Sequence, residues 1–585
     1  MGSMEEIRNV ILAIVLSVII IVGFQFYFDK PPPPGETVTA EQAARPGDPD
    51  LPRATAEVAP SAPGEDFLIP SAPGVPGPDP GARRAELIKA GARVPIRSTR
   101  LWGSVSLTGG RMDDLSLADY RESLAPDSPE ITLLTPFGSR DAYFAQFGWT
   151  AAAGADTAIP GPDTVWTARG MALTPETPLT LSWDNGQGLH FFRTIEMDGD
   201  FMFTITQRVE NRGNQPVTLY PYSLIRRHGT PEVTGFYILH EGLYGVFDGT
   251  LQEVDYDDLQ DEGSIKQTSI GGWIGITDKY WLTALVPDQK TRADSRFTHR
   301  TDDGEDRYQV DYLGSKMVVA AGGKSEVRSH FFAGAKEVDL LDSYMESLGV
   351  QRFDLAIDWG WFYFLTKPIF HGLVLINGYV GNFGISILLL TVGIKIAFFP
   401  LANKSYVAMS KMKKLQPEML KLRERFGEDK TRLNQEMMAL YKREKTNPAS
   451  GCLPIVIQIP VFFSLYKVLF VTIEMRHTPF FGWIQDLSAP DPTSVFNLFG
   501  LVPFTPPDFL MIGAWPLFMG LTMFLQQKLN PQPPDPVQAK IFLFLPIMFT
   551  FLLARFPAGL VIYWAWNNLL SILQQWVIMR RMGVR

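Results

Sequence analysis

A single lysine, Lys395, lies inside an apolar run from Ile385 to Phe399 that is otherwise suited to crossing a membrane. A lysine near the bilayer centre costs roughly 2.5–3.5 kcal/mol on insertion scales, so such a charge normally faces a protein interior or a water-filled cavity. The role that such a residue could have is electrostatic, because it would hold one positive charge at membrane depth. In the alternative, Lys395 extends its amine to the nearby membrane surface and has no further role.

Other residue patterns that could carry chemistry are weak. His240 and Glu241 are adjacent, but an isolated pair is poor evidence for acid–base catalysis. The first half has no metal-ligand spacing, no nucleophile-elbow motif and no phosphate-binding loop. Cys452 is the one cysteine, which excludes an internal disulfide. We therefore expect neither an enzyme nor a bound cofactor.

The 585 residues divide into two halves of different composition. The part before residue 350 is acidic and has the character of a water-soluble domain, whereas the part after 360 is rich in Phe, Leu, Ile, Trp and Met. The net charge of −9 argues against a general nucleic-acid binder, so no direct nucleic-acid readout is expected.

The N-terminal residues predict a membrane anchor followed by a tether. Residues 8–28 form an apolar stretch long enough to span a membrane, and no small-residue cleavage site follows it. Residues 29–95 are dominated by Pro, Ala, Gly and Asp, a composition that cannot bury a core. We expect this linker to be extended or disordered.

Residues 96–345 predict an all-β domain. Alternating segments at 179–183, 189–195, 201–209 and 217–220 are separated by turn sequences around Asn185, Asp198 and Asn211. Short alternating strands joined by Asn-Gly and Asp-Gly turns indicate an antiparallel sandwich.

The second half predicts a polytopic α-helical membrane protein. Residues 350–382 are aromatic with scattered charges, which suits an amphipathic helix in the membrane interface, or else the start of a longer span. With the N-terminal anchor, five further apolar runs give six spans; the five lie at 383–401, 453–473, 509–525, 541–556 and 558–579.

The distribution of lysine and arginine predicts the orientation of these spans. The strongly basic segment 402–450 and the short tail 580–585 should be cytoplasmic, and the loop 476–508 should lie outside. Counting back places the β domain outside and both termini in the cytoplasm. Arg555, at an outer turn, is the one basic residue that disagrees.

Residues 404–446 predict a cytoplasmic helical hairpin with one apolar stripe and basic flanks. The hairpin either is a solvated element steadied by its own stripe or docks an anionic partner or lipid headgroups. Its methionines offer adaptable apolar surface for varied clients. The stripe residues are Met412, Leu415, Met419, Leu422 and Phe426, then Leu433, Met437, Leu440 and Tyr441.

Specific motifs from about residue 354 to 582 resemble the YidC membrane-insertase family, which is related to the Oxa and Alb insertases. They are Val380–Ser386, Leu415–Glu418, Gln435–Lys442, Asn447–Pro454, Trp483–Asp491 and Phe556–Tyr563. The β domain resembles the periplasmic domain of Gram-negative members at Asp184–Gly188 and Val217–Tyr222. The resemblance covers nearly the whole chain except the linker.

The resemblance implies a five-helix insertase core with a hydrophilic groove that opens to the cytoplasm and is closed on the outside. Lys395 matches the position of a positive groove residue that is usually arginine in the family, so the planar multi-donor fork is lost while the charge is kept. Thr391, Gln527 and Trp564 match other groove positions, with some ambiguity between Gln527 and its neighbour Gln526.

The implied function is insertion and folding of nascent membrane proteins in the bacterial inner membrane, with the large domain in the periplasm. The implied partners are nascent membrane proteins, the ribosome, the Sec translocon and membrane lipids. The chain stops at Arg585 without a long basic tail, which puts tail-mediated ribosome contact in doubt. From membrane physics alone, a transporter or channel is the alternative, although inverted repeats and a paired intramembrane charge are not evident.

Overall fold

A computed structural model of the chain describes residues 84–152, 155–233, 239–426, 429–444, 453–504, 506–507, 510–530 and 536–583. The predicted anchor and most of the predicted linker lie outside these residues. Among the described residues, 536–545 belong to one compact unit and the others to a second.

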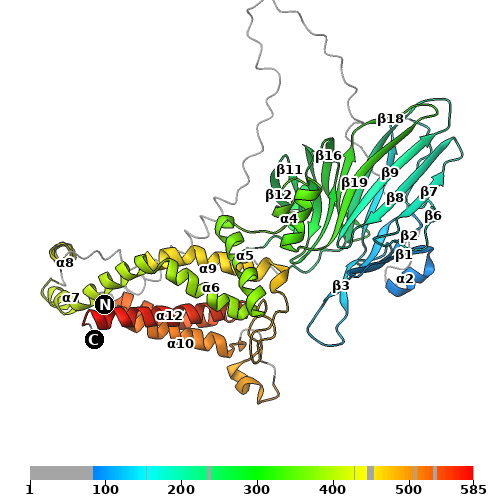
Figure 1. Cartoon of the computed structure of the whole chain (residues 1–585). Helices are drawn as coiled ribbons and strands as arrows, with labels where there is room; N and C mark the ends of the chain where they lie inside the picture. The colour runs from blue at the N-terminus through cyan, green and yellow to red at the C-terminus, as the bar shows by residue number, and fades with distance from the viewer. Residues whose placement is uncertain are drawn as a thin grey trace, which may run out of the picture. The chain divides into compact units, whose positions relative to one another are not determined.

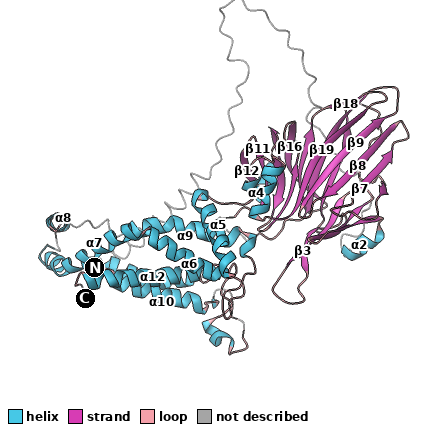
Figure 2. Cartoon of the chain, viewed as in Figure 1, coloured by secondary structure: helices cyan, strands magenta, loops and turns pink. Residues whose placement is uncertain are grey.

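Two antiparallel sheets make up the β domain, drawn in magenta in Figure 2. In the described residues the first sheet has ten strands: β1 (Arg93–Arg97), β2 (Leu101–Ser106), β3 (Met112–Arg121), β5 (Tyr143–Ala151), β10 (Val217–His228), β17 (Glu305–Gly314), β16 (Arg292–Asp302) and β13 (Ser264–Ile270) in spatial order, with β4 (Glu130–Leu134) beside β3 and β18 (Met317–Val319) beside β10.

The second sheet has nine strands within the same described ranges. Their order is β12 (Thr250–Val254), β11 (Gly242–Phe247), β14 (Trp273–Thr277), β15 (Trp281–Val286), β19 (Lys324–Ala335), β9 (Met202–Asn211), β8 (Leu189–Met197), β7 (Leu179–Asp184) and β6 (Thr167–Arg169). Large aromatic side chains fill the space between the sheets: the rings of Phe147 and Phe203 both pack on Phe331. The predicted sandwich is confirmed.

Local hydrogen bonds explain why the predicted turns form where they do. The Asn185 side chain accepts from the backbone N–H of Gln187 and Leu189, and Asp198 accepts from Asp200 and Met202. These side chains replace the ladder partners that the backbone loses at a turn. The strands predicted around both turns are confirmed as β7, β8 and β9.

Short helices complete the β domain at both ends. Helix α2 (Arg84–Ala90) precedes β1, and Arg84 pairs with Asp114 on β3. The ordered domain thus starts before residue 96, inside the segment predicted as linker. Helix α3 (Tyr256–Glu262) lies between β12 and β13, while α4 (Val338–Ser347) and the 3-10 turn η1 (Phe353–Ala356) follow the last strand.

Eight helices form the described helical part, drawn from green to red in Figure 1. They are α5 (Tyr363–Val380), α6 (Phe383–Ala397), α7 (Phe399–Phe426), α8 (Lys430–Arg443), α9 (Leu453–Val471), α10 (Ala514–Leu529) and α12 (Ala558–Arg581), while α11 (Pro536–Leu553) begins in the first compact unit. Helix α12 contacts α6, α9 and α10, and α5 contacts α6 and α9.

Length and composition alone do not mark any single described helix as able to cross a membrane. The bent pair α6 and α7, which turns by 71° at its break, is the one combination that passes that test among the described residues. Two helical segments, Gln458–Val471 and Ala539–Leu553, are apolar but shorter than such a span requires. The six predicted spans therefore remain a prediction.

Two partly buried histidines should make the β domain sensitive to acid. Burial, reinforced by nearby arginines, lowers the pKa of His228 and of His330 from 6.5 to about 4. The unfolded chain therefore binds more protons between these two pH values, so the free energy of unfolding falls as the pH is lowered through this window. The loss should approach, but not exceed, about 1.4 kcal/mol per pKa unit for each ring, because solvent screens both.

Denaturant unfolding of the detergent-solubilised protein at pH 4 to 7, followed by circular dichroism of the strands, would measure this loss. Replacing both rings, His228→Asn with His330→Asn, should flatten the pH dependence. An equally steep acid loss in the double variant would show that other groups cause it.

Candidate functional site

Lys395 lies near the C-terminal end of α6, just before the bend into α7. Its ammonium Nζ donates a hydrogen bond of 2.7 Å to Oγ of Ser571 on α12. The Ser571 hydroxyl in turn donates to the carbonyl oxygen of Asn567 at 2.8 Å, and the hydroxyl of Tyr406 also hydrogen-bonds to it. The amine is thus turned inward, toward the other helices.

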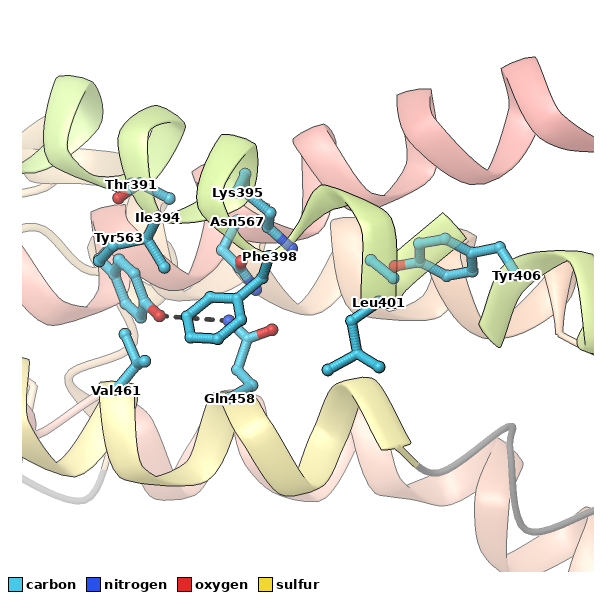
Figure 3. A pocket seen from close by; sticks show the side chains of 11 residues that line it. Thr391, Ile394, Lys395, Phe398, Leu401, Tyr406, Gln458, Val461, Tyr563 and Asn567 are labelled. Carbon is cyan, nitrogen blue, oxygen red and sulfur yellow. Dashed lines mark hydrogen bonds between the residues drawn. The ribbon is translucent and has the colours of Figure 1, made fainter. Parts of the chain in front are cut away.

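A cavity of about 50 Å³ lies beside Lys395, which is room for a few water molecules (Figure 3). It is formed where α6, the start of α7, α9 and α12 meet. Its lining residues are Thr391, Ile394, Lys395, Phe398, Leu401, Ala402, Tyr406, Gln458, Val461, Tyr563 and Asn567. Both polar and apolar side chains line it, so water and apolar segments can both make contacts there.

The polar side chains of the cavity are held by one another. Gln458 on α9 donates its Nε2 hydrogen to the Tyr563 hydroxyl at 3.2 Å, the dashed line in Figure 3. Tyr406 points its hydroxyl back toward Lys395 in the same view. Hydrogen bonds of this kind satisfy polar groups that would otherwise be costly among apolar helices.

No carboxylate lies within ion-pair distance of Lys395 in the part of the chain that the structure describes. Other intramembrane or buried cations usually have such a partner. The charge of Lys395 is hydrogen-bonded but not neutralised, so an acidic group entering the cavity would meet an uncompensated positive charge. This is the electrostatic feature that distinguishes the site.

The four groove residues predicted from sequence fall into two sets. Lys395 and Thr391 line the same cavity on consecutive turns of α6, and the Thr391 hydroxyl donates to the Ile387 carbonyl at 2.6 Å. Gln527, on α10, and Trp564, on α12, do not line it. Trp564 packs instead on the rings of Phe462 and Phe549, with ring centres 4.6 and 6.0 Å away.

Sequence reasoning missed the polar face of α12. Tyr563, Asn567, Ser571 and Gln575 recur at every fourth position, and all are at least 95% buried. A spacing of four places side chains on one face of a helix. The sequence signal for this face is the four-residue spacing of polar side chains within the apolar run 558–579, whereas the resemblance pointed on this helix only to Trp564.

The loop of residues 478–491 ties the helices together at one end. The first N–H groups of α12, at Ala558 and Gly559, donate to the carbonyls of Ala489 and Leu487 at 2.7 and 3.0 Å. The N–H of Trp515, at the start of α10, donates to Asp491 at 2.9 Å.

The start of α6 is tied to the same loop. Asn382 caps α6 by accepting from Ile385, and its amide donates to the carbonyl of Phe480 at 3.3 Å. A side chain on Gly384 would collide with the Phe480 ring, since an added Cβ would lie 2.1 Å from it. Three motifs quoted above, Val380–Ser386, Trp483–Asp491 and Phe556–Tyr563, therefore meet at one end of the helices.

Helices α7 and α8 pack against each other through the predicted stripe. Met419 and Met437 are buried together with Leu440, and the Tyr441 hydroxyl lies 3.9 Å from the Met419 sulfur. Phe426 lies between the guanidinium groups of Arg425 and Arg432. Met412 is partly buried on α7. Residues 427–428 and 445–452 lie outside the described residues.

Two family models match nearly the whole described chain. Residues 93–371 match the YidC periplasmic domain, and residues 375–584 match the 60Kd inner membrane protein. The membrane protein insertase YidC of Methylobacterium sp. (strain 4-46) is 52% identical over 613 residues, covering 99% of this chain and 96% of the relative. That of Bradyrhizobium diazoefficiens is 50% identical over 607 residues, covering 100% and 97%.

Solved structures give weaker likenesses. A crystal structure of an active YidC insertase with its first transmembrane domain resolved has a TM-score of 0.35 and 16% identity, covering 85% of this chain and 94% of that one. A galactose mutarotase related enzyme from Lactobacillus acidophilus has a TM-score of 0.31 and 9% identity, covering 41% and 97%. Likenesses at these TM-scores carry no inference about function.

The matches and the two-part fold define the class first: an inner-membrane protein with a periplasmic β domain and a helical C-terminal region. Identity of half the residues over full length then specifies the family. The chain belongs to the YidC family.

The hydrogen bond between Lys395 and Ser571 should be measurable as a coupling in stability. We expect Ser571→Ala to lower the free energy of unfolding by about 1–3 kcal/mol, because a buried charged donor loses its acceptor. The same change in a Lys395→Met background should cost much less, since no donor is then left unpaired. Thermal unfolding of the four proteins of this cycle in detergent gives the coupling, and additive single effects would contradict it.

Proposed function

We propose that this protein inserts membrane proteins and that the cavity beside Lys395 receives the polar flank of a client. Relatives of full length and 50–52% identity are named membrane protein insertases. The observation that carries the proposal is the un-neutralised ammonium of Lys395 beside a cavity between apolar helices that has room for water. Such a charge attracts an acidic flank and shortens the apolar distance that the flank must cross.

The direction of insertion follows from the placement of the cavity along α6 and α12. At the end tied to the loop 478–491, the N–H groups of the helix N-termini are already bonded to that loop and so do not offer donors to a polar segment. The cavity lies nearer to α7 and α8, which carry the basic residues. We propose that this is the cytoplasmic side, that both termini lie there, and that the sandwich lies in the periplasm.

No covalent step is needed. Once the flank is drawn into the cavity, transfer of about 20 apolar residues of the client from water into lipid supplies the driving force. Lysine retains the charge of the arginine that is usual in the family but cannot grip a carboxylate through two parallel hydrogen bonds. We propose that Lys395 and Thr391 take part directly, and that Gln527 and Trp564 act further along the client's path.

Helices α7 and α8 are proposed to dock partners of negative charge. Their buried stripe joins the two helices, which leaves basic side chains outside. Lys411, Lys421 and Arg425 are exposed and, among the described residues, form no ion pair. The ribosome and anionic lipid headgroups have the matching charge, while cooperation with the Sec translocon and chaperoning of emerging clients complete the proposal.

Replacing Lys395 by Met should impair insertion of a client with an acidic outer flank. Loss of about 1–2 kcal/mol of attraction in a partly dry site corresponds to a decrease of roughly tenfold in the rate of insertion. Lys395→Arg should retain most activity, and a client with a neutral flank should be affected less. The measurement is protease protection of the client in liposomes that contain only this protein. Equal insertion of the acidic-flank client by the Met variant would remove Lys395 from the mechanism.

Reversing the charge of α7 and α8 should weaken ribosome binding. The variant Lys411→Glu, Lys421→Glu, Arg425→Glu is expected to bind several-fold more weakly in co-sedimentation of the protein in nanodiscs, with the difference shrinking at high salt. A matched control reverses three exposed lysines of the β domain, Lys290, Lys316 and Lys324. Equal weakening in both variants would show that net charge alone matters.

A further inference from the structure

The loop between residues 495 and 504 exposes a dense group of large apolar side chains. It contains the 3-10 turn η4 (Val495–Gly500) and joins the loop 478–491 to α10. Leu501 is 83% exposed and Leu498 is 55% exposed. The other exposed apolar side chains of this loop are Phe496, Phe499, Val502 and Phe504.

This loop carries no charge. The sequence has no Asp, Glu, Lys or Arg between Asp491 and Asp508. Connecting segments that face water are usually polar, and contiguous exposed apolar surface marks a contact with lipid or protein. We therefore expect lipid or protein to shield this exposed apolar surface from water.

The loop is held in a defined shape. Leu498 and Phe499 have φ values of +53° and +58°, a conformation rare for bulky residues. Hydrogen bonds maintain it: the N–H of Phe499 donates to the Ser494 carbonyl at 2.7 Å, and that of Val502 donates to the Asn497 carbonyl at 3.1 Å. The chain thus turns so that several apolar side chains project from a short segment.

The base of the loop is attached to the N-terminus of α10. Thr493 accepts a hydrogen bond from the N–H of Ala514 at 3.0 Å, and the N–H of Val495 donates to the Ile512 carbonyl at 3.0 Å. The apolar side chains therefore start at the level where α10 begins. Helix α10 itself exposes Leu517, Phe518, Leu521 and Leu525.

We infer that the 495–504 loop inserts its apolar side chains into the outer leaflet of the membrane beside α10. The occupant is lipid rather than a protein partner because the exposed apolar surface continues onto α10. The absence of any charge in the loop suits acyl chains better than the polar rim of a protein interface. The inference rests on α10 spanning the membrane and does not require insertase activity.

An environment-sensitive label at Leu501 tests this inference. In a Cys452→Ser background, Leu501→Cys is labelled with nitrobenzoxadiazole, and the full-length protein is placed in vesicles with and without doxyl-labelled lipid. We expect a blue-shifted emission and at least threefold stronger doxyl quenching than at Met171→Cys. Met171, on the β domain, is the matched control because it is an apolar residue that is 94% exposed.

Water-like emission at Leu501, equal to that at the control, would overturn the inference. Blue-shifted emission without doxyl quenching would also overturn it, because a protein surface would then cover the loop. Insertion of a client is scored in the same vesicles, so strong quenching without insertion would count against the proposed function alone.

A second variant separates loop shape from loop chemistry. Leu498→Asn with Phe499→Gly introduces residues that adopt positive φ readily, so the turn is retained while two apolar side chains are removed. We expect doxyl quenching at Leu501 to fall at least twofold, with no decrease of the thermal unfolding temperature in detergent. Unchanged doxyl quenching at Leu501 in this variant, whatever its unfolding temperature, would contradict membrane insertion by these side chains.

Discussion

Hydrogen bonds between helix N-termini and the loop 478–491 are the constraint on which the helical part depends. The first N–H groups of a helix have no partner within the helix, and among apolar helices water does not supply one. Ala489, Leu487 and Asp491 accept the N–H groups at the starts of α12 and α10. Because the loop holds the first residues of each helix, it also fixes the rotation of that helix about its axis. That rotation decides which of the side chains farther along the helix face the cavity and which face lipid.

The position of Ser571 follows from that rotation. On α12 the buried polar side chains recur every four residues, so they share one face of the helix. Ser571 reaches Lys395, and Tyr563 reaches Gln458. These hydrogen bonds reduce the cost of a polar cavity without neutralising the lysine. The missing counter-charge therefore makes the buried lysine costly and, for the same reason, makes it attractive to an acidic client.

Much of the fold could be predicted from local patterns. The strands around Asn185 and Asp198 were predictable because the turn side chains bond to their own neighbouring backbone, which needs no distant residue. The start of the β domain was not, because α2 is short and Arg84 is tied to Asp114 across the sheet. A proline-rich composition indicates a linker but says nothing about where the first long-range contact falls.

The two-part organisation, the apolar helical segments and the lysine within the run 385–399 can all be derived from the sequence alone, since each depends on composition and spacing within one segment. Which polar residues share the cavity with Lys395 depends instead on the tertiary structure. Thr391 does because it lies one turn away on the same helix. Tyr406, Gln458 and Asn567 do, and Gln527 and Trp564 do not, because contact between helices depends on how each is rotated and where it is anchored. Those rotations are set by hydrogen bonds between residues far apart in the chain.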